Sequence, residues 1–215
     1  MLDQSGLYYP NRLARAFLVA IEDVMGERAL AALMGMSQMP QWVNQFPADD
    51  LARQFDFSYL ATLSEAMEEM YGVRGGRGLA LKVGRAAFAQ GFREFGIMRG
   101  FQDSAFRVLP LAQRVEYGLR GLASLLSHFS DQQSSVLSDG DDFLFQSEVC
   151  PFAWGRSSDK PVCHAMVGII QECLRWSTNG YEFYVREVAC RAAGADACIF
   201  RIHRTAIGEG NSVAL

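Results

Sequence analysis

The chain has no excess of basic residues, since 20 Lys and Arg stand against 24 Asp and Glu, for a formal net charge of -4. Without a general positive field, the composition argues against a nucleic-acid partner. The chain also lacks any apolar run near the roughly 20 residues that cross a bilayer. Its first residues have neither the basic nor the apolar region of a secretory signal. We therefore expect a cytoplasmic protein without a membrane span.

Cysteine is missing from the first 149 residues, and all five cysteines lie in the last third of the chain. In a reducing compartment structural disulfides are rare, which leaves packing, metal binding or redox chemistry as reasons for them. No Cys-x-x-Cys pair is present, so the most specific spacing signal for zinc is also missing. The crowding still indicates that several of these thiols are used together: Cys150, Cys163, Cys173, Cys190 and Cys198.

The N-terminal part has the apolar spacing of helices. Leu13, Phe17 and Ile21 repeat with the period of a helix that stops at Gly26. The glycine- and arginine-rich segment 73–78 matches no phosphate-binding motif and is predicted to be a solvated loop. Similar periodicity predicts further helices over residues 28–34, 50–71, 79–95 and from residue 110 to about 126.

The C-terminal part has the alternation of strands. Polar residues over 131–142 predict a loop, which is also the best candidate for a boundary. Beyond it, strands are predicted at 143–149, 181–188 and 198–202, the last two as a hairpin, with one helix from about residue 161 covering the sheet. The fold class is therefore α+β, with an N-terminal helical layer packed on a C-terminal antiparallel sheet. The predicted parts, within one compact domain, are residues 1–140, 141–204 and a tail at 205–215.

Metal-binding residue types converge on the predicted hairpin. Glu187 and Cys190 close one strand, and Cys198 opens the next. Cys163, in the first turn of the preceding helix, can complete a set of three thiolates and one carboxylate. Thiolate softness favours zinc, and four protein ligands leave no open position, so the predicted role is structural. The alternative is that cysteines act as small buried hydrophobes, which we prefer for Cys173.

One further cysteine stays undecided between these roles. Cys150 precedes a proline at the end of the first predicted strand, near the expected site. It could replace one of the four ligands, or it could simply pack.

At these residues the chain resembles the 4-vinyl reductase (4VR) domain family, as a stand-alone bacterial member. The resemblance covers roughly residues 141–204 and includes Pro161–Cys163, Val185–Gly194 and Cys198–Ile202. It implies a fold related to the small TRAPP vesicle-tethering subunits. Zinc-carrying members use a cysteine, a glutamate, a cysteine three residues later and a cysteine eight residues after that. Glu187, Cys190 and Cys198 have this spacing, and Cys163 stands where the first cysteine belongs.

Aromatic side chains are plentiful, with 15 Phe, 7 Tyr and 3 Trp. Phe143, Phe145, Phe152 and Trp154 cluster around the predicted sheet. Such side chains suit either a packed core or an apolar ligand pocket. The resemblance favours the pocket, since family members house small hydrophobic or aromatic molecules. It also implies tetrapyrrole handling, because the family name comes from a proposed role in bacteriochlorophyll synthesis.

The function expected from these residues is non-catalytic binding of a small hydrophobic ligand, including a tetrapyrrole intermediate, beside a structural zinc. A vinyl reductase, or an accessory subunit in bacteriochlorophyll biosynthesis, is the first alternative. Reduction needs a hydride or electron source, and the sequence has neither a dinucleotide fingerprint nor an iron–sulfur cysteine run. A dimeric scaffold or sensor that signals to a partner is the second alternative. A homodimer is compatible with these interpretations.

Overall fold

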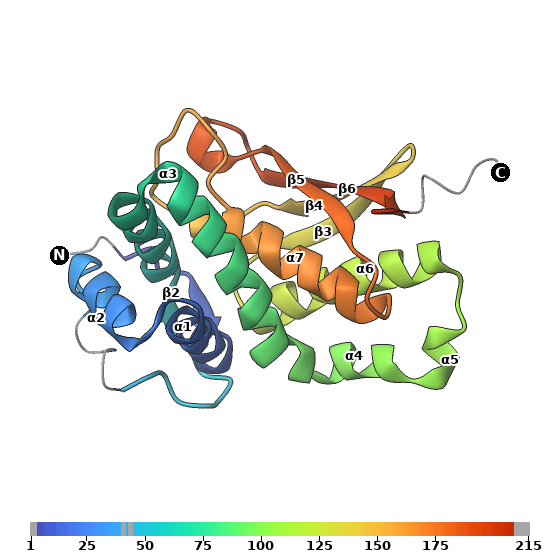
Figure 1. The fold of residues 1–215 in the computed structure, drawn as a ribbon, viewed down its shortest axis with the longest axis horizontal. Coiled ribbons are helices and arrows are strands. Elements are labelled where there is room, and N and C mark those ends of the chain that lie inside the picture. Colours follow the sequence, from blue (N-terminus) through green and yellow to red (C-terminus); the bar gives the residue numbers. More distant parts are fainter. Residues whose placement is uncertain (1–3, 40–41, 43–44, 209–215) are drawn as a thin grey trace.

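The fold is built around one four-stranded antiparallel sheet with strand order β3-β4-β6-β5. The computed structural model describes residues 4–39, 42 and 45–208. Two helices pack beneath the sheet, α6 (Leu111–Phe129) and α7 (His164–Ser177). Figure 1 shows this layer, with the sheet above α7. The strands are β3 (Ser134–Asp139), β4 (Asp142–Ser147), β5 (Phe183–Ala189) and β6 (Cys198–Ala206).

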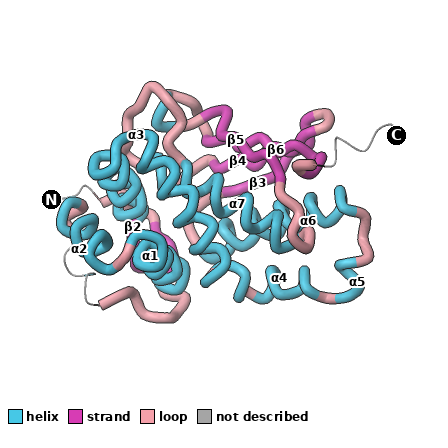
Figure 2. Tube along the Cα trace, in the orientation of Figure 1, coloured by secondary structure: helices cyan, strands magenta, loops and turns pink. Residues whose placement is uncertain are grey.

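An outer helical layer covers the other side of α7. The long helix α3 packs against α7, and α1 packs against α3 (Figure 2). A small two-stranded sheet pairs β1 with β2 next to α1. Helical and sheet layers are thus segregated along the chain, which confirms the predicted α+β class. The elements are β1 (Tyr8–Pro10), α1 (Asn11–Met25), α2 (Glu27–Met36), β2 (Arg53–Asp56) and α3 (Phe57–Gln90).

Helix α3 differs from the prediction at both of its predicted limits. It begins at Phe57 and not near residue 50, because β2 precedes it and the Asp56 side chain accepts a hydrogen bond from the Ser58 N–H. The predicted loop over 73–78 is wrong, since this segment is helical. Gly72, at φ 71°, kinks the helix there without ending it. Glycine tolerates this backbone, so the sequence contained a break signal but not its outcome.

Short turns connect α3 to α6. They are η2 (Phe92–Glu94), α4 (Gly96–Arg99), η3 (Gly100–Gln102) and α5 (Ser104–Arg107). In Figure 1 α4 and α5 lie at the lower right, away from the outer helices. None of the described helices combines the length and apolar character needed to cross a bilayer.

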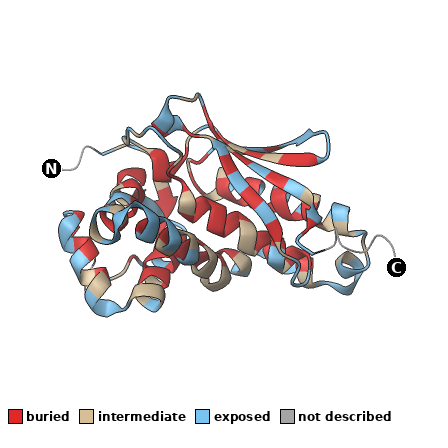
Figure 3. Cartoon of the chain, turned by 45° about the horizontal axis from the view of Figure 1, so that its top comes forward, coloured by how far each residue is buried: buried red, intermediate tan, exposed pale blue. Residues whose placement is uncertain are grey.

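Helix α7 lies between α3 and the sheet and is buried along most of its length (Figure 3). Two glycines allow the helices to approach closely. A Cβ added at Gly84 would lie 2.0 Å from the Ala165 carbonyl oxygen, and one at Gly168 would lie 2.1 Å from that of Leu81. Any larger residue would push α3 and α7 apart. The helix that carries the start of the candidate site is therefore held firmly in place.

The loop predicted over 131–142 is wrong, because most of it forms β3. This edge strand pairs with β4 and buries only Val136. Its other side chains are mostly polar and exposed, which gives it the composition of a loop. The sheet therefore starts before residue 141, and the division into parts at 140 and 204 stays a prediction. The strands expected at 143–149 and 198–202 and the helix over the sheet are confirmed.

Candidate metal centre

The donor side chains meet where α7 begins and the β5–β6 hairpin turns. Along β5 the side chains of Phe183, Val185 and Glu187 all point to the buried face, because alternate residues of a strand share a face. The same alternation in β6 turns Cys198 inward together with Phe200. A carboxylate thus occupies a position that packing would give to an apolar side chain. Its burial needs a compensating partner.

The turn between the strands brings Cys190 to the same point. Cys190 follows β5 directly, and its carbonyl accepts hydrogen bonds from the N–H groups of Ala193 and Ala195. Gly194 closes this turn with φ 88°, a left-handed backbone that favours glycine. Cys163 comes from the other side as the residue that precedes α7, and its side chain makes no helix-capping bond. Its sulfur is therefore free to face the hairpin.

The resulting cluster is small and buried. The ligand atoms of Cys163, Glu187, Cys190 and Cys198 all lie within 4.8 Å of one another. The Cys163 Sγ lies 3.6 Å from the Cys198 Sγ and 4.0 Å from the Cys190 Sγ, and the last two sulfurs are 4.0 Å apart. Sulfurs at the corners of a tetrahedral zinc site, with Zn–S bonds of about 2.3 Å, are about 3.8 Å apart. The sulfur spacing therefore fits zinc.

The carboxylate of Glu187 has one committed oxygen and one free oxygen. Its Oε2 accepts a hydrogen bond of 2.8 Å from the Cys163 N–H. Its Oε1 is buried and has no hydrogen-bond partner among the described residues. An unpaired buried oxygen costs free energy, and a cation is one group that can satisfy it. This orphaned oxygen is a second, independent indication of a metal.

The acid–base properties of the cluster agree with this interpretation. Burial raises the pKa of Glu187 to about 8, and the charge on Cys190 adds to the effect. Burial also raises the pKa of the Cys163 thiol well above its usual value. A hydrogen bond with Cys150 raises the pKa of Cys198. Without a cation these donors hold their protons, so metal binding would release protons and depend on pH.

Cys150 lies directly beside the four donors. Its sulfur is 3.4 Å from the Cys163 Sγ, and its side chain is buried. The structure therefore places a fifth thiol next to the cluster, and its role as ligand or neighbour stays undecided. Cys173 is different, because it lies on the buried face of α7 and its sulfur contacts the Gly118 carbonyl oxygen at 3.4 Å. It is outside the cluster, as predicted.

The four aromatic residues predicted to bind a ligand lie around the sheet. Phe143, Phe145 and Phe152 are buried in the main core, and Trp154 packs against it from a half-buried position. Phe145 lies against Phe200, with ring centroids 6.4 Å apart. None of these residues lines the cavities found among the described residues. Their role in ligand binding stays a prediction.

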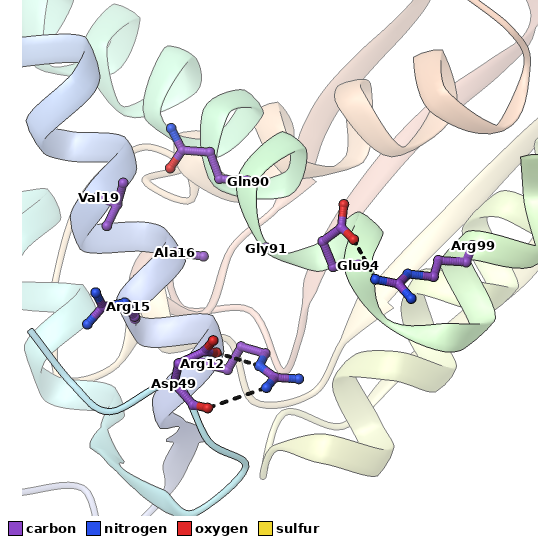
Figure 4. Close-up of a pocket in the computed structure, with 9 residues that line it drawn as sticks. All are labelled: Arg12, Arg15, Ala16, Val19, Asp49, Gln90, Gly91, Glu94 and Arg99. Atoms are coloured by element: carbon purple, nitrogen blue, oxygen red, sulfur yellow. Dashed lines mark hydrogen bonds and ion pairs between the residues drawn. The ribbon is translucent and has the colours of Figure 1, made fainter.

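One of these cavities is a polar cleft of about 390 Å³ between α1 and the end of α3 (Figure 4). Arg12 pairs with Asp49 at 2.6 Å, and Arg99 pairs with Glu94 at 2.8 Å. Both guanidinium groups already have carboxylate partners. The cleft thus offers little unpaired charge to a ligand.

A second cavity, here called the apolar groove, has about 600 Å³ and lies between α6 and the short turns before it. No sequence signal pointed to it, because its walls come partly from segments without regular periodicity. Its volume falls within the range of about 300–1,000 Å³ that is usual for ligand sites. It is lined by Ile97, Gly100, Phe101, Phe106, Leu109, Tyr117, Arg120 and Gly121.

Fold and cluster together define an α+β protein whose sheet and last helix carry a buried Cys₃Glu donor set. Residues 144–204, which contain all four donors and Cys150, match the model of the 4-vinyl reductase (4VR) domain. This confirms the resemblance to that domain family. The chain is also similar to the bacteriochlorophyll synthase 23 kDa chain of Cereibacter sphaeroides, with 32% identity over 123 residues. That match covers 51% of this chain and 58% of the relative, which is less than two thirds of its length.

Solved H-NOX structures share the fold. A point mutant of T. tengcongensis H-NOX has a TM-score of 0.59 and 12% identity, covering 90% of this chain and 96% of that chain. A point mutant of the H-NOX protein from K. algicida has a TM-score of 0.56 and 15% identity, covering 90% and 95%. At these identities the likeness concerns the fold alone.

Proposed function

We propose that this chain is a non-catalytic binding protein for a small hydrophobic or aromatic ligand, including a tetrapyrrole intermediate of bacteriochlorophyll synthesis, with a structural zinc ion. The observation that carries the zinc part is the convergence of three buried sulfurs and one buried carboxylate within 4.8 Å. Soft sulfur donors favour zinc over magnesium or calcium. A bound zinc ion would cross-link α7 to the β5–β6 hairpin.

A structural role follows from how many positions the protein fills. Catalytic zinc sites keep a position open for water or substrate, whereas structural sites have four protein ligands. Here Cys163, Glu187, Cys190 and Cys198 supply four donors, and none is more than 6% exposed. Water has little access to such a site. The buried free thiols also favour a reducing compartment, so we retain the cytoplasm as the location.

The ligand part of the proposal is supported by the relative and by the fold. The Cereibacter sphaeroides relative is named as a chain of bacteriochlorophyll synthase. Bacteriochlorophyll precursors are planar, mostly apolar macrocycles that carry carboxyl groups. One of the structurally similar H-NOX proteins is described through the distortion of its heme, so a protein of this fold can hold a tetrapyrrole.

The same relative favours a second candidate, an accessory subunit of a bacteriochlorophyll-synthesising enzyme or a vinyl reductase. In that case the chain would act with a partner that supplies the hydride or electrons. A dimer that signals to a partner is a third use of the same binding site. Both alternatives keep the zinc and the ligand.

Native mass spectrometry of unchelated protein, isolated from the organism that encodes it, tests the proposal. We expect one zinc per chain and a bound organic molecule with the visible absorption of a tetrapyrrole. A chain without metal and without any organic ligand contradicts the proposal. Conversion of a vinyl-bearing precursor on addition of NADPH or reduced ferredoxin would establish the second candidate in its place.

A further inference from the structure

We propose that the apolar groove binds one face of a planar tetrapyrrole and that Arg120 holds a carboxylate of this ligand. The inference rests on the proposed function and assigns a place to its ligand. It differs from the prediction at Phe143, Phe145, Phe152 and Trp154. The argument depends on the shape, lining and exposure of the groove.

The floor of the groove is an aromatic surface. The rings of Phe101 and Phe106 lie 4.7 Å apart between centroids, and the ring of Tyr117 continues the row at 6.4 Å from Phe106. Gly121 allows this arrangement, because a Cβ at that position would lie 2.7 Å from the Phe101 ring. Flat aromatic surfaces gain free energy by stacking on other flat rings. The groove therefore suits a planar partner better than a branched one.

The apolar side chains of the groove are partly open to solvent. Tyr117 is 50% exposed and Ile97 is 43% exposed, and Val108, next to the lining residue Leu109, is 82% exposed. Single exposed apolar residues are normal on a protein surface, but several gathered around one concavity indicate a binding site. Covering them with a ligand would remove apolar surface from water, which is favourable.

Among the described residues, Arg120 is the only charged one that lines the groove. Its Nε lies 2.9 Å from the Glu116 carboxylate, and both side chains are substantially exposed. Such surface ion pairs contribute little, about 0–1 kcal/mol. A ligand carboxylate could therefore share the guanidinium at little cost. Apolar walls with a single cation at the side match an amphiphilic ring system with a carboxyl substituent.

The segment that forms one wall consists of short turns. α4 and α5 have four residues each and η3 has three, so few helical hydrogen bonds hold them. The Trp176 Nε1–H donates to the Met98 carbonyl at 3.3 Å, which ties this wall to the end of α7. Lightly held segments can adjust when a ligand enters. Trp176 is also a natural fluorescence reporter for the groove.

Titration of the zinc-loaded protein with protoporphyrin IX tests the inference, with visible absorption and tryptophan fluorescence as readouts. We expect one porphyrin per chain, bound about tenfold more weakly by Tyr117→Ala, since a stacking aromatic is lost. Arg120→Gln should weaken binding of protoporphyrin IX by about tenfold but leave binding of its dimethyl ester unchanged, because the ester has no carboxylate. Tyr184→Ala is the matched control, as Tyr184 is 53% exposed on β5 and does not line the groove.

Three results would overturn the inference, and they can be told apart. If no variant or wild-type protein binds the porphyrin, the proposed function fails as well. If wild type binds and Tyr117→Ala and Arg120→Gln bind equally well, only the groove assignment fails; a loss in Phe145→Leu would then favour the sequence-based pocket. If Tyr117→Ala abolishes self-association in sedimentation while porphyrin binding is unchanged, a second copy of the chain covers the groove.

Discussion

At its N-terminal end, α7 starts beside a closed cluster of buried donors; near its C-terminal end, it contacts short turns that border an open apolar groove. The first end has no room for a guest other than a single ion. The second end has about 600 Å³ and exposed aromatic side chains. The difference indicates that one end of the helix is held rigidly by coordination, whereas the other can adapt to a ligand. Structural and binding roles are thus separated along one helix.

The largest effect should come from opening the closed end with Cys190→Ser. The variant replaces a thiolate by a poor zinc ligand, so we expect metal content to fall below half an equivalent. The free energy of unfolding should fall by at least about 3 kcal/mol, which corresponds to a melting temperature lower by roughly 6–12 °C. Metal analysis and calorimetry measure both quantities.

Cys173→Ser is the matched control for this change. Cys173 is also buried in α7, but its sulfur contacts the Gly118 carbonyl and no donor of the cluster. Its metal content should equal that of the wild type. If Cys190→Ser also keeps full metal content and an unchanged melting temperature, coordination does not hold the closed end.

The middle of α7 offers a test of how firmly both ends are positioned. Gly84→Ala places a methyl group about 2 Å from the Ala165 carbonyl, so α3 and α7 must separate. We expect a loss of about 2–3 kcal/mol in urea unfolding. Gly78→Ala, on the same helix with nothing within 4 Å, should instead stabilise by about 0.5–1 kcal/mol. Equal stability of the two variants would show that the close contact does not exist.

A smaller and pH-dependent effect is expected away from both ends, at the start of α3. Burial alone would raise the pKa of Asp56, but hydrogen bonds from Ser5 and Ser58 outweigh it and lower the pKa from its usual value of 3.8. The carboxylate therefore contributes stability above about pH 4, and this contribution is lost as the pH falls through the folded-state pKa. Asp56→Asn should cost about 1 kcal/mol at pH 7 and much less at pH 3. An equal cost at both pH values would contradict this assignment.

The smallest stability change should occur at the open end. Tyr117→Ala removes a half-exposed side chain that packs on one side only, so we expect a change within about 0.5 kcal/mol. Its effect should instead be seen in porphyrin binding. A loss above about 1.5 kcal/mol in urea unfolding would mean that the groove is part of the core and not a ligand site.

Elements with strong local signals could be predicted from the sequence. The apolar stripe of Leu13, Phe17 and Ile21 indicated α1, and strict alternation indicated β5 and β6. The order of donors along the hairpin also indicated which four side chains come together. This was possible because Glu187, Cys190 and Cys198 are close in the chain, so a single turn decides their placement.

Other features depend on tertiary placement that one sequence does not encode locally. β3 has a polar edge-strand composition and looked like a loop, and Gly72 kinks a helix that it was expected to end. Cys150 is 13 residues from Cys163, and only the packed structure brings their sulfurs to 3.4 Å. Inward-facing aromatics such as Phe145 look the same for a core and for a pocket. The groove has no periodic signal because short turns form one of its walls.

X-ray absorption at the zinc edge tests the central claim most directly, because it counts the sulfur and oxygen neighbours of the ion. The account predicts three sulfurs at about 2.3 Å and one oxygen at about 2.0–2.2 Å. Four sulfurs would mean that Cys150 takes the place of Glu187. A protein that retains no zinc at all would contradict the account of the closed end.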